Sequence, residues 1–190
     1  MNNMKWITLQ ANWIGYYEDV VSDELCDKIM HYSDNVKQLQ KSTYSTSTGK
    51  SDRSDERVKM DDGWFRNGEQ YYNEIKDCFL LALKKYQEKH HDCVCQRYTD
   101  FRLNKYSKGG FMSRHIDNIH HSHGQTYGYP QLTALLMLND DYEGGNFLIA
   151  ENEYETAKGS AIVFPSNFMF PHAVKKVEKG TRYSIVTWLM

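Results

Sequence analysis

Residues 181–189 read Thr181-Arg182-Tyr183-Ser184-Ile185-Val186-Thr187-Trp188-Leu189, a run of β-branched and aromatic residues that predicts a strand. Side chains two positions apart in a strand share a face, so Arg182, Ser184, Val186 and Trp188 lie on one side and the residues between them on the other. Similar short segments, separated by turn residues, precede this stretch at 101–106, 111–117, 132–138, 146–150, 160–164 and 172–177. No segment long enough for a crossover helix separates them, so the C-terminal half is expected to form an antiparallel sandwich or barrel.

The N-terminal half has the periodicity of helices. Ser22, with Asp23 and Glu24 after it, is a typical helix start, because its hydroxyl caps backbone N–H groups and the acids face the positive end of the helix dipole. Apolar residues then recur at spacings of three and four, at Leu25, Ile29, Tyr32, Val36 and Leu39. A second helix is expected after Asn67, which would cap it. Its apolar face consists of Tyr72, Ile75, Phe79, Leu83 and Tyr86.

Between these helices, residues 41–62 are rich in Ser, Thr, Lys and Asp and contain almost no apolar side chains. Such a segment buries little surface, so it is interpreted as a loop, either a lid that contacts a substrate or a plain surface connection. The chain is predicted to be a single domain, residues 1–190, mainly β with N-terminal helices (α+β). Residues 1–95 supply helical support and this loop, and residues 96–190 form the β core.

Composition limits the classes of protein to which the chain can belong. Its 190 residues and 22.4 kDa suit one domain with its own hydrophobic core. The 23 Lys and Arg against 25 Asp and Glu give a net charge of −2, which argues against a protein that coats nucleic acid. No apolar run is long enough to span a membrane and the N-terminus lacks a secretory signal pattern, so a cytoplasmic protein is expected. The cysteines form no CxxC pair and are interpreted as reduced thiols, with disulfides or a zinc site as alternatives: Cys26, Cys78, Cys93 and Cys95.

His115 and Asp117 are the pair that says most about chemistry. On a strand, residues at this spacing project from one face and can reach the same metal ion. The pattern HxD alone is a weak signal, and a third ligand must come from another strand; His172, which follows Phe170-Pro171, offers it. Two imidazoles and one carboxylate on one face of an octahedron hold non-haem Fe(II) and leave the other positions open.

Arg182 indicates a second component of the same site. An arginine inside a small barrel is unfavourable unless an anion meets it. A carboxylate pairs with a guanidinium in bidentate geometry, and the Ser184 hydroxyl lies on the same face of the strand. A dicarboxylate that chelates the iron at one end and pairs with Arg182 at the other fits both observations.

The C-terminal half resembles the iron- and 2-oxoglutarate-dependent dioxygenases, and among them the prolyl 4-hydroxylase-like branch. The likeness is strong over residues 97–190 and extends weakly through the helix at Ser22. It rests on the order and spacing of Tyr106-Ser107-Lys108-Gly109-Gly110-Phe111, His115-Ile116-Asp117, Leu138-Asn139-Asp140, Glu143-Gly144-Gly145, Lys158-Gly159-Ser160-Ala161-Ile162-Val163-Phe164-Pro165, His172-Ala173-Val174, Lys179-Gly180-Thr181-Arg182-Tyr183-Ser184 and Trp188.

This resemblance implies a double-stranded β-helix, a jelly roll of the cupin type, braced by the N-terminal helices. It also implies Fe(II) as cofactor, 2-oxoglutarate as co-substrate, O2 as oxidant and ascorbate as a reductant. His115, Asp117 and His172 take the places of the catalytic metal ligands. Arg182 takes the place of the basic residue that pairs with the distal carboxylate of 2-oxoglutarate.

Other residues of the co-substrate pocket follow from the same resemblance. Tyr106 matches a tyrosine that hydrogen-bonds 2-oxoglutarate in relatives, and Val174 is expected to form an apolar wall on the face of His172. Relatives often carry a further Tyr or Thr near Leu136-Met137 and Phe147, where this chain is apolar. Ser184 is expected to supply the missing polar contact.

The implied function is hydroxylation of an unactivated C–H, with oxidative decarboxylation of 2-oxoglutarate to succinate and CO2. Peptidyl proline is the first expected substrate, and another amino acid or a small molecule is the alternative. Nucleic-acid demethylases tend to carry an arginine six residues after the oxoglutarate arginine, where this chain has Trp188. The intact ligand residues disfavour a catalytically silent jelly-roll binding module. The expected partner is therefore a peptide, protein or small-molecule substrate rather than a membrane or a nucleic acid, and the oligomeric state stays open.

A second group of histidines follows Asp117. His120, His121 and His123 share a stretch with glycines and Pro130 and are interpreted as solvated loop side chains, with substrate contact as the alternative. Tyr127 and Tyr129 belong to the same stretch and are candidates for the rim of the substrate pocket.

Overall fold

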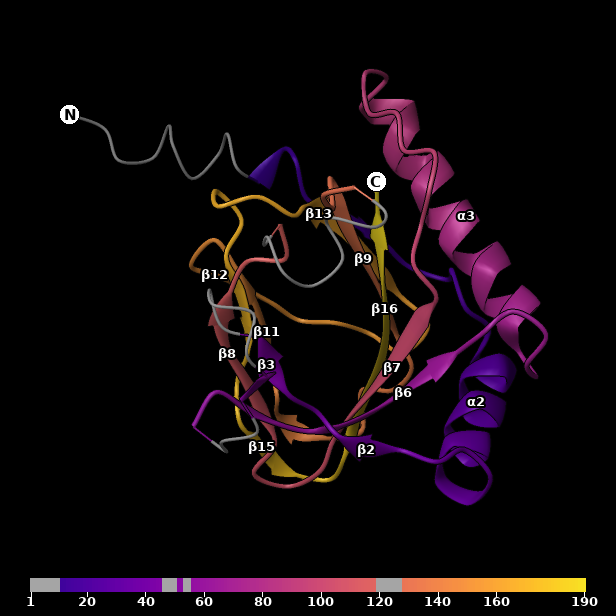
Figure 1. Cartoon of the computed structure of the whole chain (residues 1–190), viewed down its shortest axis with the longest axis vertical. Helices are drawn as coiled ribbons and strands as arrows, with labels where there is room; N and C mark the ends of the chain where they lie inside the picture. The colour runs from indigo at the N-terminus through magenta and orange to yellow at the C-terminus, as the bar shows by residue number, and fades with distance from the viewer. Residues whose placement is uncertain (1–10, 46–50, 53–55, 119–127) are drawn as a thin grey trace.

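The computed structural model describes residues 11–45, 51–52, 56–118 and 128–190, and two antiparallel sheets dominate it (Figure 1). The larger sheet consists, in spatial order, of β1 (Gly15–Tyr17), β13 (Ala161–Pro165), β9 (Leu132–Met137), β16 (Arg182–Leu189), β7 (Phe101–Tyr106), β6 (Asp61–Phe65) and β2 (Gln40–Lys41). The smaller sheet consists of β12 (Asn152–Tyr154), β11 (Phe147–Ile149), β14 (His172–Val174), β8 (Phe111–His115) and β5 (Val58–Lys59). Two short ribbons pair β10 (Glu143–Gly144) with β15 (Val177–Lys179) and β3 (Tyr44–Ser45) with β4 (Ser51–Asp52).

The two faces of β16 separate the two halves of the core, as the alternation of residues 181–189 predicts. Val186 and Trp188 belong to an apolar cluster between the two sheets, to which β9, β11 and β14 also contribute. Tyr183, Ile185 and Leu189 belong to a second cluster on the outer face of the larger sheet. The chain therefore forms the predicted jelly roll, and side chains from both sheets fill the interior between them.

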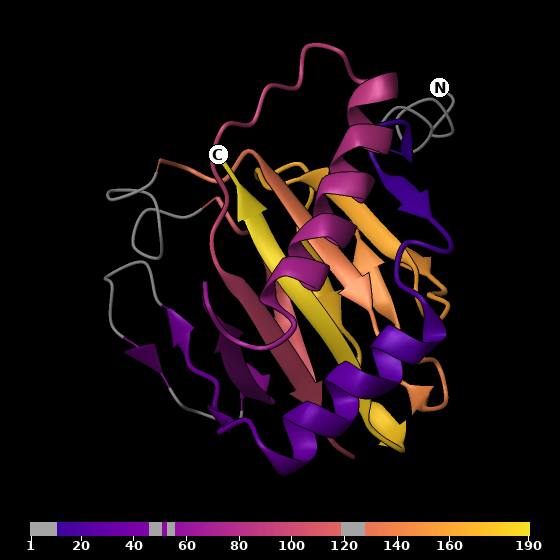
Figure 2. The ribbon, with the colours of Figure 1, turned by 90° about the vertical axis from the view of Figure 1, so that its right-hand side faces the viewer.

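Helices α2 (Asp23–Asn35) and α3 (Tyr72–Lys89) cover the outer face of the larger sheet (Figure 2). The predicted cap of α2 is confirmed, since the Leu25 backbone N–H donates to Ser22 Oγ at 3.3 Å. The helix ends at Asn35, however, so Val36 and Leu39, the last two residues of the predicted apolar stripe, lie beyond the helix.

The predicted cap of the second helix is wrong. The residue before α3 is Tyr71, in the left-handed region with φ 66, and Asn67 lies several residues earlier. Two consecutive turns account for this delay: the Glu69 N–H donates to the Arg66 carbonyl at 2.9 Å and the Tyr72 N–H to the Glu69 carbonyl at 3.2 Å. The apolar face is largely as predicted, with these residues buried: Tyr72, Ile75, Phe79, Ala82 and Tyr86.

Residues 41–62 do not form the plain loop that their composition predicts. Within the described part of this segment, β5 pairs with β8 and β6 pairs with β7, so both barrel sheets receive a strand from it. Val58 and Met60 are buried in the inner cluster. Pairing with distant strands overrides the low strand preference of Asp and Gly. The assignment of residues 1–95 to helical support is corrected accordingly, because β1, β5 and β6 belong to the β core.

Two further expectations concern the state of the cysteines and the presence of membrane-spanning segments. All four cysteines are free in the structure, with Cys93 Sγ and Cys95 Sγ 4.0 Å apart. No helix in the described ranges combines the length and the apolar character needed to cross a membrane.

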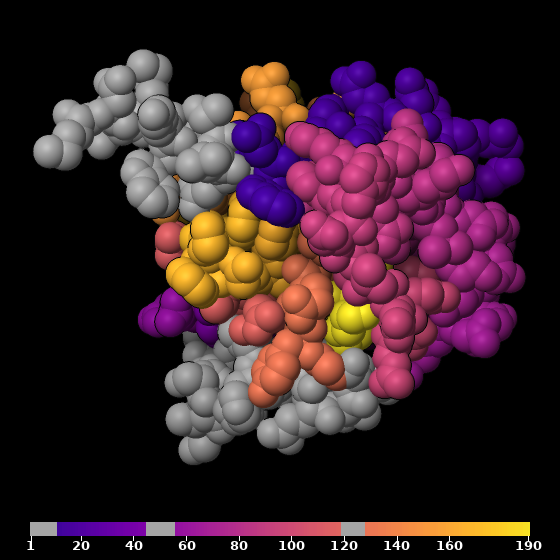
Figure 3. Space-filling view, turned by 90° about the horizontal axis from the view of Figure 1, so that it is seen from above, coloured from indigo at the N-terminus to yellow at the C-terminus, as the bar shows by residue number. Residues whose placement is uncertain are grey.

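The C-terminus lies at the upper end of the barrel, where β16 ends (Figure 1). In the view from above (Figure 3), the last residues of the chain, in yellow, lie between two other segments. The pink segment around and after α3 is on one side, and the orange segment that leads into β9 is on the other. Backbone hydrogen bonds connect these parts: the Gln131 N–H donates to the Leu189 carbonyl at 2.7 Å, and the Gln96 N–H to the Met190 carbonyl at 2.9 Å. Asp117 lies close to this end, because the side chain of the next residue, Asn118, donates to the Pro130 carbonyl at 2.8 Å.

Candidate functional site

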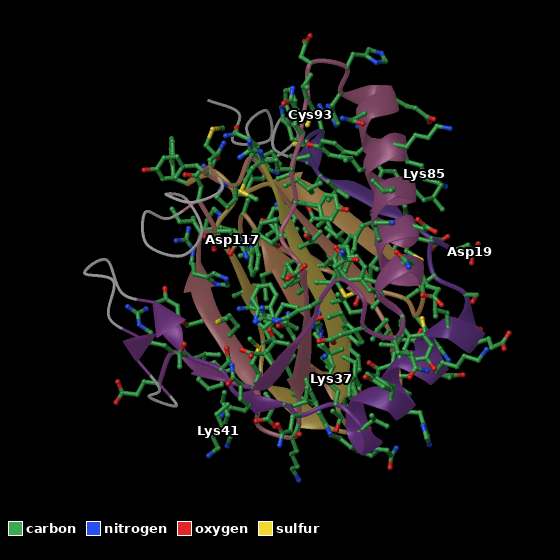
Figure 4. All side chains as sticks on the ribbon, turned by 45° about the vertical axis from the view of Figure 1, so that its right-hand side comes forward. Asp19, Lys37, Lys41, Lys85, Cys93 and Asp117 are labelled. Atoms are coloured by element: carbon green, nitrogen blue, oxygen red, sulfur yellow. The ribbon has the colours of Figure 1, made fainter. Side chains whose placement is uncertain are left out.

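His115, Asp117 and His172 meet between the sheets at the upper part of the barrel (Figure 4 labels Asp117). His115 is the last residue of β8 and His172 the first of β14, and the antiparallel register sets them opposite each other. Asp117 Oδ1 lies 3.5 Å from His115 Nε2, and Asp117 Oδ2 lies 3.2 Å from His172 Nε2. One ligand atom from each side chain lies within 4.8 Å of the others, so the three can coordinate a single ion.

Backbone carbonyls orient both imidazoles. Nδ1 of His115 lies 2.8 Å from the Ser113 carbonyl oxygen, and Nδ1 of His172 lies 3.2 Å from the Phe170 carbonyl oxygen. When Nδ1–H donates to a carbonyl, the lone pair of the neutral ring is on Nε2. Both Nε2 atoms face Asp117, so the protein presents two nitrogen lone pairs and a carboxylate to the same point.

The charge states of these groups suit a metal ion. Burial lowers the pKa of His115 to about 4, and the neighbouring His172 adds to that effect. Burial alone would raise the pKa of Asp117, but the two imidazoles and a hydrogen bond from Thr133 outweigh it and hold that pKa below its usual range. A neutral imidazole and an ionised carboxylate are the forms in which these residues bind metals.

Thr133 and Ser166 support the carboxylate, and the sequence analysis did not identify either residue. Thr133 Oγ1 donates to Asp117 Oδ2 at 2.7 Å and lies 2.9 Å from Ser166 Oγ. Both side chains are buried. The sequence gives only a weak indication of Thr133: it is the one residue with a hydroxyl group in an otherwise apolar strand, Leu132-Thr133-Ala134-Leu135-Leu136-Met137.

Replacing Thr133 by Val is expected to weaken metal binding about 10- to 100-fold, because outer partners of a ligand set its orientation and basicity. The measurement is Mn(II) affinity by electron paramagnetic resonance titration. Thr156→Val, which changes the same residue type two positions after the end of β12, serves as the control. An unchanged Mn(II) affinity in Thr133→Val would remove Thr133 from the support of the metal site.

Arg182 is buried deeper in the same interior, with 0% of its surface exposed. Its Nη1 donates to Ser184 Oγ at 3.0 Å, its Nη2 lies 3.3 Å from Met137 Sδ, and its guanidinium carbon lies 5.4 Å from the centre of the Tyr106 ring. Its Nε has no hydrogen-bond partner, and no carboxylate of the described residues pairs with the guanidinium. A buried cation without a counter-charge is strongly destabilising, so this group fits a bound anion.

The other residues predicted for the co-substrate pocket, Tyr106, Val174 and Ser184, are all buried in the structure. Tyr106 pairs with Arg182 across β7 and β16 and is 3% exposed. Burial raises the pKa of its hydroxyl, against the opposing charge of Arg182, so the phenol stays a hydrogen-bond donor. Val174 is buried opposite Phe147 in the inner cluster. Ser184 is 0% exposed on the Arg182 face of β16.

The second histidine group is not placed with the site. His120, His121, His123 and Tyr127 lie outside the described residues. Tyr129 is described and is 43% exposed.

The donors present fit Fe(II) and a dicarboxylate together. The triad supplies two nitrogens and one oxygen, a set that suits a non-haem ferrous ion. The unpaired guanidinium of Arg182 supplies the counter-charge for a carboxylate.

Comparison with known proteins points to the same chemistry. A family model described as the 2OG-Fe(II) oxygenase superfamily matches residues 101–190. Human prolyl 3-hydroxylase 2 is 38% identical over 69 residues, which is 33% of this chain and 10% of that protein. A PKHD-type hydroxylase of Stenotrophomonas maltophilia (strain R551-3) is 29% identical over 123 residues, 61% of this chain and 54% of that protein. The matched part of the chain thus spans a tenth of the first relative and about half of the second.

Solved structures share the fold at low sequence identity. A Pseudomonas putida prolyl-4-hydroxylase superimposes with a TM-score of 0.68 and 17% identity, covering 93% of this chain and 91% of that one. A Trichoplax adhaerens prolyl hydroxylase, in complex with a hypoxia-inducible-factor peptide fragment, gives a TM-score of 0.73 and 18% identity, covering 99% and 88%. Residues 101–190, which match the 2OG-Fe(II) oxygenase superfamily, carry Arg182 and an intact His-Asp-His facial triad.

Proposed function

We propose that this chain hydroxylates an unactivated C–H of a prolyl group in a peptide or protein, while 2-oxoglutarate is decarboxylated to succinate and CO2. The observation that carries the proposal is Arg182, a fully buried guanidinium that no carboxylate of the described residues pairs with, in the same barrel as the triad. The prolyl class is supported by the names of the similar proteins, which include prolyl 3- and 4-hydroxylases.

In this proposal His115, Asp117 and His172 hold Fe(II), which supplies the activation of O2 and the oxidation of the substrate C–H. These three side chains would hold the ion and would leave its other positions to 2-oxoglutarate and O2. Arg182 binds the distal carboxylate of 2-oxoglutarate through its guanidinium, whose Nε has no partner among the described residues.

Three neighbours complete the co-substrate pocket. The Ser184 hydroxyl accepts from Nη1 and fixes the plane of the guanidinium. The Tyr106 hydroxyl, protonated because burial raises its pKa, donates to the same carboxylate. Val174 forms an apolar wall that keeps water out of the space between Arg182 and the metal.

A prolyl peptide library tests this function. With Fe(II), 2-oxoglutarate and O2, we expect peptides that gain the mass of one oxygen atom, with one succinate per modified peptide, measured by mass spectrometry. The same peptides with alanine at each proline are the control. Succinate formed while every prolyl peptide stays unmodified would reject the prolyl class. No succinate, with or without peptide, would reject the oxygenase function itself.

A further inference from the structure

The inner face of β6 and β7 carries polar side chains that neither the triad nor the Arg182 pocket uses. In β7, Phe101 and Leu103 belong to the outer cluster and Tyr106 to the inner one, so alternation turns Arg102 and Asn104 inward. In the antiparallel register, Asp62 of β6 stands opposite Asn104, and Trp64 opposite Arg102. The group defined by Asp62, Arg102 and Asn104 is called here the β6–β7 polar wall.

Arg102 lies at the Trp188 end of this interior. Its guanidinium carbon lies 4.9 Å from the centre of the Trp188 ring, and Trp188 itself is 4% exposed. Stacking on an aromatic face fixes the plane of a guanidinium and leaves its N–H edge free to bind a planar anion.

Arg102 is separate from the co-substrate arginine. Across the sheet, Arg182 stands opposite Tyr106, and Val186 stands opposite Arg102. Four residues along a strand correspond to roughly 13 Å, which is longer than the five-carbon chain of 2-oxoglutarate. The two arginines therefore start from separate places along the sheet, and Arg182 is the one that stands opposite Tyr106.

The side chains of the β6–β7 polar wall do not satisfy one another's hydrogen-bonding groups. Asp62 and Asn104 are 6% and 3% exposed, and their Oδ1 atoms, like Nε of Arg102, are buried without a hydrogen-bond partner in the part of the chain that the structure describes. Asp62 and Arg102 are diagonal neighbours of opposite charge, yet they form no ion pair. Buried acceptors and donors without partners are destabilising, and a bound molecule that offers both an anion and N–H groups would complete them.

We propose that Arg102 binds a carboxylate of the prime substrate, while Asp62 and Asn104 accept hydrogen bonds from its N–H groups. This inference rests on the proposed prolyl function and deepens it: the enzyme selects prolyl substrates with a carboxylate close to the ring. That carboxylate belongs to a free amino acid, to a peptide C-terminus or to an acidic side chain next to the proline.

Paired probes test the inference by binding rather than turnover. Isothermal titration calorimetry under argon uses the protein loaded with Mn(II) and 2-oxoglutarate. Three pairs differ only in a carboxylate against an amide: L-proline and L-prolinamide, acetyl-Ala-Pro and its amide, and acetyl-Ala-Pro-Asp-amide and acetyl-Ala-Pro-Asn-amide. In at least one pair, the carboxylate member is expected to bind about 10- to 150-fold more tightly, the range of a charge-assisted hydrogen bond.

The preference is expected to disappear in Arg102→Gln and to survive in part in Arg102→Lys, which keeps the charge but loses the planar fork. Arg97→Gln, an exposed arginine five positions earlier, is the matched control and should keep the full preference. The pair that shows the preference identifies the source of the carboxylate.

Two results would overturn the inference: equal affinities within all pairs in the unmodified protein, or an Arg102→Gln variant in which only 2-oxoglutarate binding is weakened. The first result needs no variant, so it stands even if Arg102→Gln fails to fold. A further pair, acetyl-Ala and its amide, separates this inference from the proposed function. An Arg102-dependent preference in that pair, with no binding of any prolyl probe, would reject the prolyl class and support the role of Arg102.

Discussion

Purified Asp117→Ala protein, supplied with Fe(II), 2-oxoglutarate and O2, is expected to form no succinate above the metal-free background. Asp117 is the carboxylate between two imidazoles, and its oxygens lie 3.5 Å and 3.2 Å from their Nε2 atoms. Its removal takes away one of three ligands and the anion that balances the charge of the metal. Succinate is measured by mass spectrometry and metal affinity by Mn(II) titration, and both should fall together.

The control for this variant is Asp92→Ala, which removes an exposed carboxylate after α3 and should leave both quantities unchanged. Undiminished succinate formation by Asp117→Ala would contradict the assignment of the facial triad. Loss of succinate with normal Mn(II) affinity would contradict the ligand role, because the carboxylate would then act elsewhere in the reaction.

Replacing Arg182 by Met is expected to raise the 2-oxoglutarate concentration needed for half-maximal succinate formation about 10- to 150-fold. The change removes a charge-assisted contact of about 1.5–3 kcal/mol while it nearly keeps the side-chain volume. A second readout is independent of turnover. In the absence of ligand, the variant should be as stable as the unmodified protein or more stable, because an uncompensated buried cation is gone.

The stabilisation that 2-oxoglutarate gives should be lost in the same variant, since binding to the native state raises its stability in proportion to ln(1 + [L]/Kd). Arg182→Lys keeps the charge and should retain part of both effects. An Arg182→Met protein with an unchanged 2-oxoglutarate requirement and an unchanged ligand-dependent Tm would exclude Arg182 from the co-substrate pocket.

The parts of the fold that the sequence predicts are those with strong local patterns. β7 occupies residues 101–106 as predicted, and β16 begins one residue after the predicted start. In β7 the apolar residues Phe101 and Leu103 alternate with polar ones, and β16 is rich in β-branched and aromatic residues. The sequence predicts the triad for a similar reason, since the two-residue spacing of His115 and Asp117 places both side chains on one face of a strand. Arg182 is found because a charge in an apolar strand needs a partner.

The parts that the sequence misses depend on contacts between distant residues. Asp61-Asp62-Gly63 has little strand preference of its own, and β6 forms because β7, some forty positions later, offers a free edge. Thr133 and Asn104 look like isolated polar residues in strands, and only the register shows what their side chains face. Asn67 has the composition of a cap, but the turns before Tyr72 determine where α3 begins.

The central claim is that one barrel interior holds a metal at the triad and a dicarboxylate against Arg182. A crystal structure of the protein with Mn(II) and 2-oxoglutarate, grown without O2, measures this directly through the anomalous signal of the metal. We expect one Mn(II) bound by His115 Nε2, Asp117 and His172 Nε2, and a 2-oxoglutarate whose distal carboxylate lies within hydrogen-bond distance of Arg182. A metal bound elsewhere, or a distal carboxylate that does not contact Arg182, would contradict the account.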